Sequence, residues 1–159
     1  MIKTAYKSTI ILLINLLPKI NSFDSLRGTL YNLLGVKSGK NFKVGSNAFI
    51  FSPESLIVGD NCYIGVMTYV GSGNIKMGDN VLIGNHVSIL PSNHTDREKG
   101  NFRFGRMENK GITIGNNCWL CAQSIIIAGV SISDNTKVAA GTVVLKSNYE
   151  NKFLKNIFK

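Results

Sequence analysis

The sequence predicts an all-β solenoid of stacked triangular coils, with a short helical segment in front of it. Three observations support this fold class: an apolar residue returns every six residues, glycine and asparagine follow it at fixed places, and the pattern then starts again. A hexad is long enough for one short strand and one tight turn, so three hexads close one coil of three short parallel strands. Because a single coil cannot bury its apolar residues, stacking of coils has to supply the core.

Five segments carry the repeat most clearly, and each places asparagine at its fourth position. They are residues 44–50, 58–64, 77–83, 114–120 and 132–138. Two of the spacings match one coil, because 132 − 114 is 18 and 77 − 58 is 19, whereas 58 − 44 is only 14. We expect about five coils between residues 42 and 146. Ile64, Ile83, Leu120 and Val138 are expected to stack in one inward column.

Residues 1–41 are predicted to form a helical segment in front of the coils. An apolar run from residue 10 to residue 17 ends at Pro18 and has Lys3, Lys7 and Lys19 around it. No small-residue cleavage site follows, so the pattern is not typical of a removed signal peptide. The run is shorter than the roughly 20 residues that a membrane span needs. It therefore indicates a short helix that packs on the body or lies on an anionic membrane surface.

The glycines and asparagines of the repeat are expected at coil corners, where a positive φ is often required. Cys62 and Cys118 take places that small residues hold in other repeats, and Cys121 takes a glycine place, so all three are predicted to be structural. Three cysteines argue against a disulfide framework and favour a reducing compartment such as the cytoplasm. The C-x-x-C spacing of Cys118 and Cys121 lacks further ligands nearby, so no metal is expected.

Lysine and arginine outnumber aspartate and glutamate by 18 to 9, which gives a net charge of +9. Such an excess favours an anionic partner, either nucleic acid, anionic lipid or a phosphorylated small molecule. A nucleic-acid binder would also carry a recognisable motif or a basic and aromatic surface cluster, and the sequence contains neither. Nucleic acid is therefore not expected as a partner.

The repeat is interrupted between Met77 and Ile114. These residues are 37 apart, about two coils, yet no second apolar set follows Ile89. Residues 92–111 are polar and charged instead, and we expect them to form a loop pushed out of a coil corner. Long loops in compact domains are usually functional, and this one opens with His94, one of two histidines in the chain. After the last coil, residues 147–159 are expected to form a basic tail.

The hexads, the run SNHTDRE at 92–98 and the segment 112–146 resemble the hexapeptide-repeat acyltransferases. The most similar branch holds the maltose and galactoside O-acetyltransferases and the sugar acetyltransferases of capsule and O-antigen synthesis. The resemblance implies a left-handed parallel β-helix, a homotrimer and acetyl-CoA as acetyl donor. It implies that His94 is catalytic and that Trp119, Ala122, Ala140 and Lys146 contact the CoA.

The chemistry of acetyl transfer suits a histidine at this place. A sugar hydroxyl is a poor nucleophile until a base removes its proton, and imidazole exchanges a proton close to neutral pH. His94 is predicted to be this base, with Asp96 or a carboxylate of another chain as a candidate to orient it. His86 lies within a hexad and is expected to be a structural or rim residue.

We therefore expect an acetyl-CoA-dependent O-acetyltransferase that acts on a saccharide, in surface polysaccharide biosynthesis, in the cytoplasm or at the inner face of the membrane. One alternative is an N-acetyltransferase of an amino sugar carried on a nucleotide, and another is a non-catalytic scaffold. A zinc carbonic anhydrase of the same fold needs three histidine ligands, and the chain has two. That activity is excluded.

Overall fold

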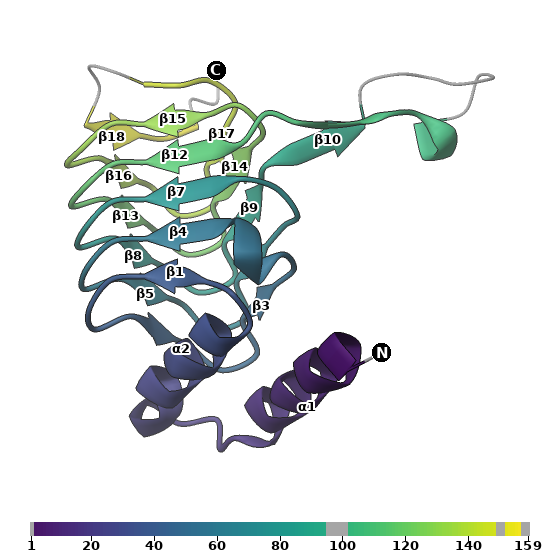
Figure 1. Cartoon of the computed structure of the whole chain (residues 1–159). Coiled ribbons are helices and arrows are strands. Elements are labelled where there is room, and N and C mark those ends of the chain that lie inside the picture. Colours follow the sequence, from purple (N-terminus) through teal and green to yellow (C-terminus); the bar gives the residue numbers. More distant parts are fainter. Residues whose placement is uncertain (1, 95–101, 149–151, 157–159) are drawn as a thin grey trace.

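A computed structural model describes residues 2–94, 102–148 and 152–156. The chain forms a left-handed parallel β-helix of about six turns, preceded by two short helices (Figure 1). Three parallel sheets make the sides of a triangular prism, and we name them A, B and C in the order in which the chain meets them. The predicted fold class is confirmed, with about six turns in place of the predicted five coils.

Each sheet takes one short strand from each coil. Sheet A contains β1 (Lys37–Ser38), β4 (Leu56–Val58), β7 (Ile75–Met77), β12 (Ile112–Ile114) and β15 (Ser131–Ile132). Sheet B contains β2 (Lys43–Val44), β5 (Tyr63–Ile64), β8 (Leu82–Ile83), β13 (Trp119–Leu120), β16 (Lys137–Val138) and β18 (Phe153–Leu154). Sheet C contains β3 (Phe49–Ile50), β6 (Tyr69–Val70), β9 (Ser88–Leu90), β14 (Ile125–Ile127) and β17 (Val143–Val144).

The remaining elements lie before the coils or leave them at the corners. They are α1 (Ile2–Leu16), the 3-10 helix η1 (Asn21–Phe23), α2 (Asp24–Leu33), η2 (Pro53–Ser55), β10 (Ser92–His94), η3 (Phe102–Phe104) and β11 (Met107–Asn109). In the part of the chain that the structure describes, no helix is both long and apolar enough to cross a membrane.

The predicted inward column is confirmed in sheet B. Ile64 pairs with Ile83, Ile83 with Leu120, and Leu120 with Val138, and all four side chains are fully buried at 0% exposure. Equivalent columns of buried apolar residues line sheets A and C. Each column is continuous along the prism, so every coil is held by the coil above and the coil below.

The irregular spacing of the first repeat is explained by the register of the first coil. Val44 pairs with Ile64 and not with Val58, so the two residues that are 14 apart lie in different columns. The partner of Val58 is Ser38, 58 − 38 = 20 residues earlier, and η2 takes up the additional length. The first coil thus starts before residue 42, and a polar residue at an apolar place conceals it in the sequence.

Asparagines hold the corner between sheets A and B in a continuous ladder. Asn41, Asn61, Asn80, Asn117 and Asn135 all have φ between 55° and 60°, in the left-handed region that asparagine tolerates well. Each of the first four donates a side-chain hydrogen bond from Nδ2 to Oδ1 of the next, over 3.1 to 3.3 Å. The predicted positive φ at the coil corners is confirmed here.

Helix α2 closes the lower end of the prism. Gly28 lies so close to the first coil that a Cβ there would be 2.4 Å from the carbonyl oxygen of Phe42. Arg27 is buried at 2% exposure, pairs with Asp24 over 2.7 Å, and also donates to the carbonyl of Pro18. The hydrogen bond from Arg27 to Pro18 ties the connection between α1 and α2 to helix α2, and the ion pair with Asp24 balances the buried charge.

The far end of the chain differs from the predicted tail over residues 147–159. Phe153 and Leu154 form β18, which pairs with β16 and extends sheet B by one strand. Asn156 accepts a hydrogen bond from Val143 N over 3.2 Å and donates to Gly141 O over 3.0 Å. The described residues 152–156 therefore start a further coil and do not form a separate appendage.

Asn80 tests whether corner geometry stabilises the solenoid. Asn80→Ala removes two ladder hydrogen bonds and puts alanine, which tolerates the left-handed region less well than asparagine, at a φ of 57°, so we expect a loss of about 1–2 kcal/mol in the free energy of unfolding. Asn80→Gly removes the same bonds without the strain and should lose clearly less. Urea unfolding measures both, and equal losses would show that the backbone conformation contributes nothing.

Candidate active site

The interrupted coil projects an arm from the corner between sheets C and A (Figure 1). The chain leaves the prism after β9 and returns at β12, and between them β10 and β11 form an antiparallel pair with His94 opposite Met107. The predicted loop over residues 92–111 is therefore a two-stranded ribbon over its described residues near the prism. We call the described parts of this excursion, residues 92–94 and 102–109, the arm.

Several hydrogen bonds fix the base of the arm to the neighbouring coils. Ser92 Oγ donates to Ser72 O over 2.8 Å, and the backbone N–H groups of Lys110 and Gly111 both donate to Pro91 O over 3.1 Å. Asn109 Oδ1 accepts from Gly111 N over 3.1 Å and from Asn74 N over 3.3 Å. His94 follows Ser92 by two residues, so a rigid anchor positions the predicted base.

A hydrogen bond within the arm favours one tautomer of His94. Its Nδ1 lies 3.2 Å from the carbonyl oxygen of Gly105. A carbonyl oxygen only accepts, so Nδ1 carries the hydrogen, and the other ring nitrogen of the neutral imidazole, Nε2, has a free lone pair. The side chain is exposed and faces an open hollow of about 530 Å³ that Asn93, Phe102 and Arg103 also line. Nε2 can therefore accept a proton from a bound hydroxyl.

A groove continues from this hollow along the corner between sheets C and A. Leu90, Ser92, Asn93, Lys110, Ile127 and Ala128 line it, and its volume is about 280 Å³. Asn93 borders both spaces, so hollow and groove adjoin. Strands β9, β14 and β17 are neighbours in sheet C, which places Lys146 on the same corner two coils further along. Lys146 is exposed and borders a third hollow with Phe153 and Lys155.

The other predicted CoA residues lie elsewhere on the prism. Ala122 and Ala140 are exposed at the corner between sheets B and C, where Gly141 N donates to Ala122 O over 3.0 Å. Trp119 lies on the outer side of sheet B at 43% exposure, with Lys137 Nζ 4.1 Å from the centre of its ring. One chain therefore brings His94 and Lys146 to the same corner, but not Trp119, Ala122 or Ala140.

His86 lies at the corner of sheets B and C, in agreement with the predicted structural or rim position. Its φ is 59°, its backbone N–H donates to Val66 O over 2.9 Å, and its side chain is exposed. Asn47 holds the corresponding place two coils earlier with a φ of 57°. Asp96, the candidate to orient His94, lies outside the described residues.

The surroundings of the three cysteines agree with the predicted structural role. All three are free and buried, and burial raises the pKa of the Cys62 and Cys118 thiols. The two thiols donate to Gly78 O over 3.1 Å and to Ser133 O over 3.2 Å. Among the residues that the structure describes, no group of three or more histidine, cysteine, aspartate or glutamate side chains is placed to hold a metal ion.

The sequence does not reveal the part that Gly105 plays at this site. Its contribution is a backbone carbonyl, which every residue has, so no residue type marks it. The groove residue Lys110 is also missed, because it is one of 18 basic residues and the loop is rich in charge. Only the glycine within the run FRFGR could have pointed to a turn near His94.

Comparison with known proteins supports the fold and the repeat. Two family models match the chain: the bacterial transferase hexapeptide model (six repeats) over residues 111–146, and the hexapeptide repeat of succinyl-transferase over residues 55–91. Together they cover the coils on both sides of the arm. The chain belongs to the hexapeptide-repeat transferase family.

Two curated relatives of this hexapeptide-repeat chain are acetyltransferases by name. It is 34% identical over 110 residues to galactoside O-acetyltransferase of Escherichia coli (strain K12), which covers 65% of this chain and 54% of that protein. It is 32% identical over 123 residues to the Escherichia coli (strain K12) protein named "Putative colanic acid biosynthesis acetyltransferase WcaF", covering 76% of this chain and 65% of that protein. The chain thus spans less than two thirds of either relative.

Solved structures agree with this family. A maltose O-acetyltransferase from Clostridium difficile 630 superposes with a TM-score of 0.82 at 25% identity, covering 94% of this chain and 79% of that one. A galactoside acetyltransferase in complex with coenzyme A gives a TM-score of 0.78 at 27% identity, covering 91% and 72%. The similarity extends over almost the whole hexapeptide-repeat chain and includes a protein that binds CoA.

Thiol labelling tests the structural reading of the cysteines. Because Cys62 and Cys118 are buried and their thiol pKa is raised, neither should react with an aromatic disulfide reagent at pH 8 in the native protein. All three cysteines should react once the chain is unfolded in guanidinium. Fast labelling of Cys62 or Cys118 in the native state, located by mass spectrometry, would contradict the burial that the fold requires.

Proposed function

We propose that the protein is an acetyl-CoA-dependent O-acetyltransferase that acts on a saccharide, with His94 as the general base. The observation that carries the proposal is the hydrogen bond from His94 Nδ1 to Gly105 O, which leaves Nε2 free beside a groove. The names of the galactoside and maltose O-acetyltransferase relatives support the reaction and the saccharide acceptor. The complex of a relative with coenzyme A supports the donor.

The proposed reaction is a direct transfer of the acetyl group. Nε2 of His94 takes the proton of the acceptor hydroxyl as its oxygen attacks the acetyl carbonyl carbon. The bond from that carbon to sulfur then breaks, and CoA leaves as a thiol after its sulfur takes the proton from Nε2 of His94. The negative charge on the carbonyl oxygen has to be met by hydrogen-bond donors in the transition state. The arm holds the base in the tautomer that this sequence of steps requires.

The CoA is proposed to lie along the corner groove toward Lys146. CoA carries three phosphoryl groups, and Lys110 and Lys146 lie along this corner of a chain with a net charge of +9. Lys155, at the corner between sheets B and C, borders the same hollow as Lys146. An exposed lysine ammonium is a suitable phosphate ligand. If CoA binds at the corner between sheets C and A, its acetyl group can lie near His94 while lysine side chains contact its phosphoryl groups.

A homotrimer is part of the proposal, because one chain does not assemble all of the predicted site. Trp119, Ala122 and Ala140 are on other sides of the prism from His94. Closed symmetric assemblies with repeated interfaces are common among soluble proteins. In a trimer, the corner of one chain can face sheet B and the adjoining corner of its neighbour. Trp119, Ala122 and Ala140 would then contact CoA from the second chain.

The acceptor class rests on the relatives. The WcaF relative is named for colanic acid biosynthesis, which supports a role in making a surface polysaccharide. A hydroxyl acceptor is favoured over an amine, because the relative at 34% identity is named an O-acetyltransferase. A cytoplasmic location agrees with three free cysteines. The membrane contact predicted for residues 1–20 does not involve the proposed catalytic corner. It would be made by the outer side of helices α1 and α2.

Replacement of His94 is the main test of the proposed chemistry. His94→Ala should keep the fold, since the side chain is exposed on the arm, and should leave the affinity for acetyl-CoA within a few-fold. Turnover on a galactoside or another accepted sugar should fall by on the order of 10² to 10⁴. Release of the CoA thiol, followed with sugar and amino-sugar acceptors side by side, measures this and separates O-transfer from N-transfer.

The matched control replaces the second histidine. His86→Asn removes an imidazole but keeps a residue that tolerates the positive φ, as Asn47 does at the corresponding corner. Its turnover should stay close to that of the unmodified protein. A dead His86→Asn variant, or an active His94→Ala variant, would refute the assignment of the base. A protein that neither binds acetyl-CoA nor releases CoA with any acceptor would be a scaffold.

Mixing two inactive variants tests whether the site is shared between chains. Ala122→Trp should block the CoA arm, and His94→Ala removes the base. If each site uses His94 of one chain and Ala122 of another, random mixed trimers should regain about a quarter of the full activity. No recovery after unfolding and refolding the variants together would contradict the shared site, provided that light scattering gives a mass of three times 17.4 kDa.

A further inference from the structure

We propose that the outer side of the two helices at the lower end of the solenoid is a binding face for an anionic lipid membrane. Figure 1 shows α1 and α2 side by side below the first coil. The end cap of a solenoid normally presents a polar outer face, because apolar residues there would be exposed to water. This cap presents large apolar side chains instead. Leu12, Leu13, Leu16, Ile20, Leu26 and Leu33 are all exposed.

Helix α1 is apolar around most of its circumference, and the solenoid covers one side only. Ile10 and Ile14 are buried against the body, which confirms packing for that side of the helix. Leu12 and Leu16 lie on the opposite side at 58% and 71% exposure. A helix that is apolar on every side needs cover on every side, from protein or from lipid. The solenoid cannot provide that cover for Leu12 and Leu16.

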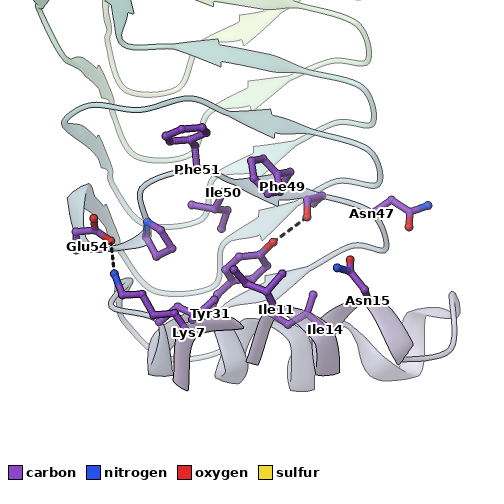
Figure 2. Close-up of a pocket in the computed structure, with 13 residues that line it drawn as sticks. Lys7, Ile11, Ile14, Asn15, Tyr31, Asn47, Phe49, Ile50, Phe51 and Glu54 are labelled. Carbon is purple, nitrogen blue, oxygen red and sulfur yellow. Dashed lines mark hydrogen bonds and ion pairs between the residues drawn. The ribbon is translucent and has the colours of Figure 1, made fainter. Parts of the chain in front are cut away.

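Contact between α1 and the first coil is also incomplete. Figure 2 shows a pocket of about 260 Å³ between them, with Ile11 and Ile14 below it and Phe49, Ile50 and Phe51 above it. The ion pair of Lys7 with Glu54 at 3.5 Å borders the pocket, and both side chains are more than half exposed, so the pair contributes little stability. Packing on the body therefore explains only part of the apolar content of α1.

Helix α2, like α1, has one side buried against the prism and an exposed apolar side away from it. Asp24, Arg27, Gly28 and Tyr31 are buried toward the prism, and Leu26 and Leu33 are exposed on the side away from it. The outward sides of α1 and α2 lie at the same end of the molecule (Figure 1). We call this surface, made of Leu12, Leu13, Leu16, Ile20, Leu26 and Leu33, the helical end face.

Charge favours an anionic bilayer over a second copy of the chain. Lys7 is on the side of α1 toward the body, where it pairs with Glu54, whereas Lys19 is exposed next to Ile20 of the face, and residues 1–20 contain no aspartate or glutamate. Two copies that met through this face would bring like charges together, whereas a bilayer with anionic headgroups attracts them. The 15-residue α1 cannot span the bilayer, so it lies in the interface with its apolar side toward the acyl chains.

Vesicle co-sedimentation with the full chain tests this face. The protein should pellet with vesicles that contain phosphatidylglycerol, but not with pure phosphatidylcholine, and added salt should release it. Leu12→Glu should lower the partition onto anionic vesicles by on the order of tenfold or more. Ile57→Glu is the matched control, because Ile57 is an apolar residue at 42% exposure on sheet A, away from the face. It should bind as the unmodified protein does.

The competing explanations give different results. If the unmodified protein stays in solution with anionic vesicles, or if both glutamate variants bind equally weakly, the proposal is wrong. If Leu12→Glu instead lowers the mass in light scattering without lipid, a second copy covers the face and the proposal is also wrong. Circular dichroism should be unchanged in both variants. Because Leu12 is distant in sequence and fold from the arm, acetyl transfer to a soluble acceptor should be unchanged.

Discussion

Stacking of one inward apolar side chain per six residues is the constraint on which the rest of this structure depends. The column of sheet B runs from Val44 through Ile64 and Ile83 to Leu120 and Val138. A coil that lost one of these contacts would expose the coil above it and the coil below it. The corner between sheets A and B must therefore turn within the four residues between two strands, and the asparagine ladder at positive φ satisfies both the backbone geometry and the hydrogen bonding. Because the inside of the prism is filled by these columns, the functional side chains have to lie on its outer surface, at its corners or on the arm.

The arm is the place where the chain leaves the prism without breaking the columns. Leu90 still pairs with Ile127 before the chain departs, and Ile112 pairs with Ile75 when it returns. The excursion is thus inserted between two intact coils and anchored at Pro91 and Asn109. A loop with such an anchor can hold a reactive side chain at a fixed place, which a flexible tail cannot do. The position and tautomer of His94 both follow from this insertion.

The sequence predicts the columns, the corner asparagines and the point of interruption, because each leaves a periodic trace in residue type. It does not predict the first coil, because Ser38 stands where the period requires an apolar residue and its partner Val58 lies 20 residues away. The pairing of β10 with β11 is not predicted either, because both strands are polar and show no apolar period. Strand β18 is missed because it does not follow β16 at the regular spacing of the repeat. The carbonyl of Gly105 carries no side-chain signal. The sequence does not predict contacts that backbone atoms make, or which residues another chain would contribute to the site.

The central claim is that the arm holds His94 with its hydrogen on Nδ1 and leaves Nε2 free to accept a proton. Nitrogen-15 NMR of the imidazole rings measures this directly in the neutral side chain, with His86 as an internal reference on the same molecule. The account predicts that His94 is mainly the Nδ1–H tautomer, because the bond to Gly105 O fixes that hydrogen. A His94 that is mainly the Nε2–H tautomer in the intact protein would contradict the account, because its outward nitrogen could then donate a proton but not accept one.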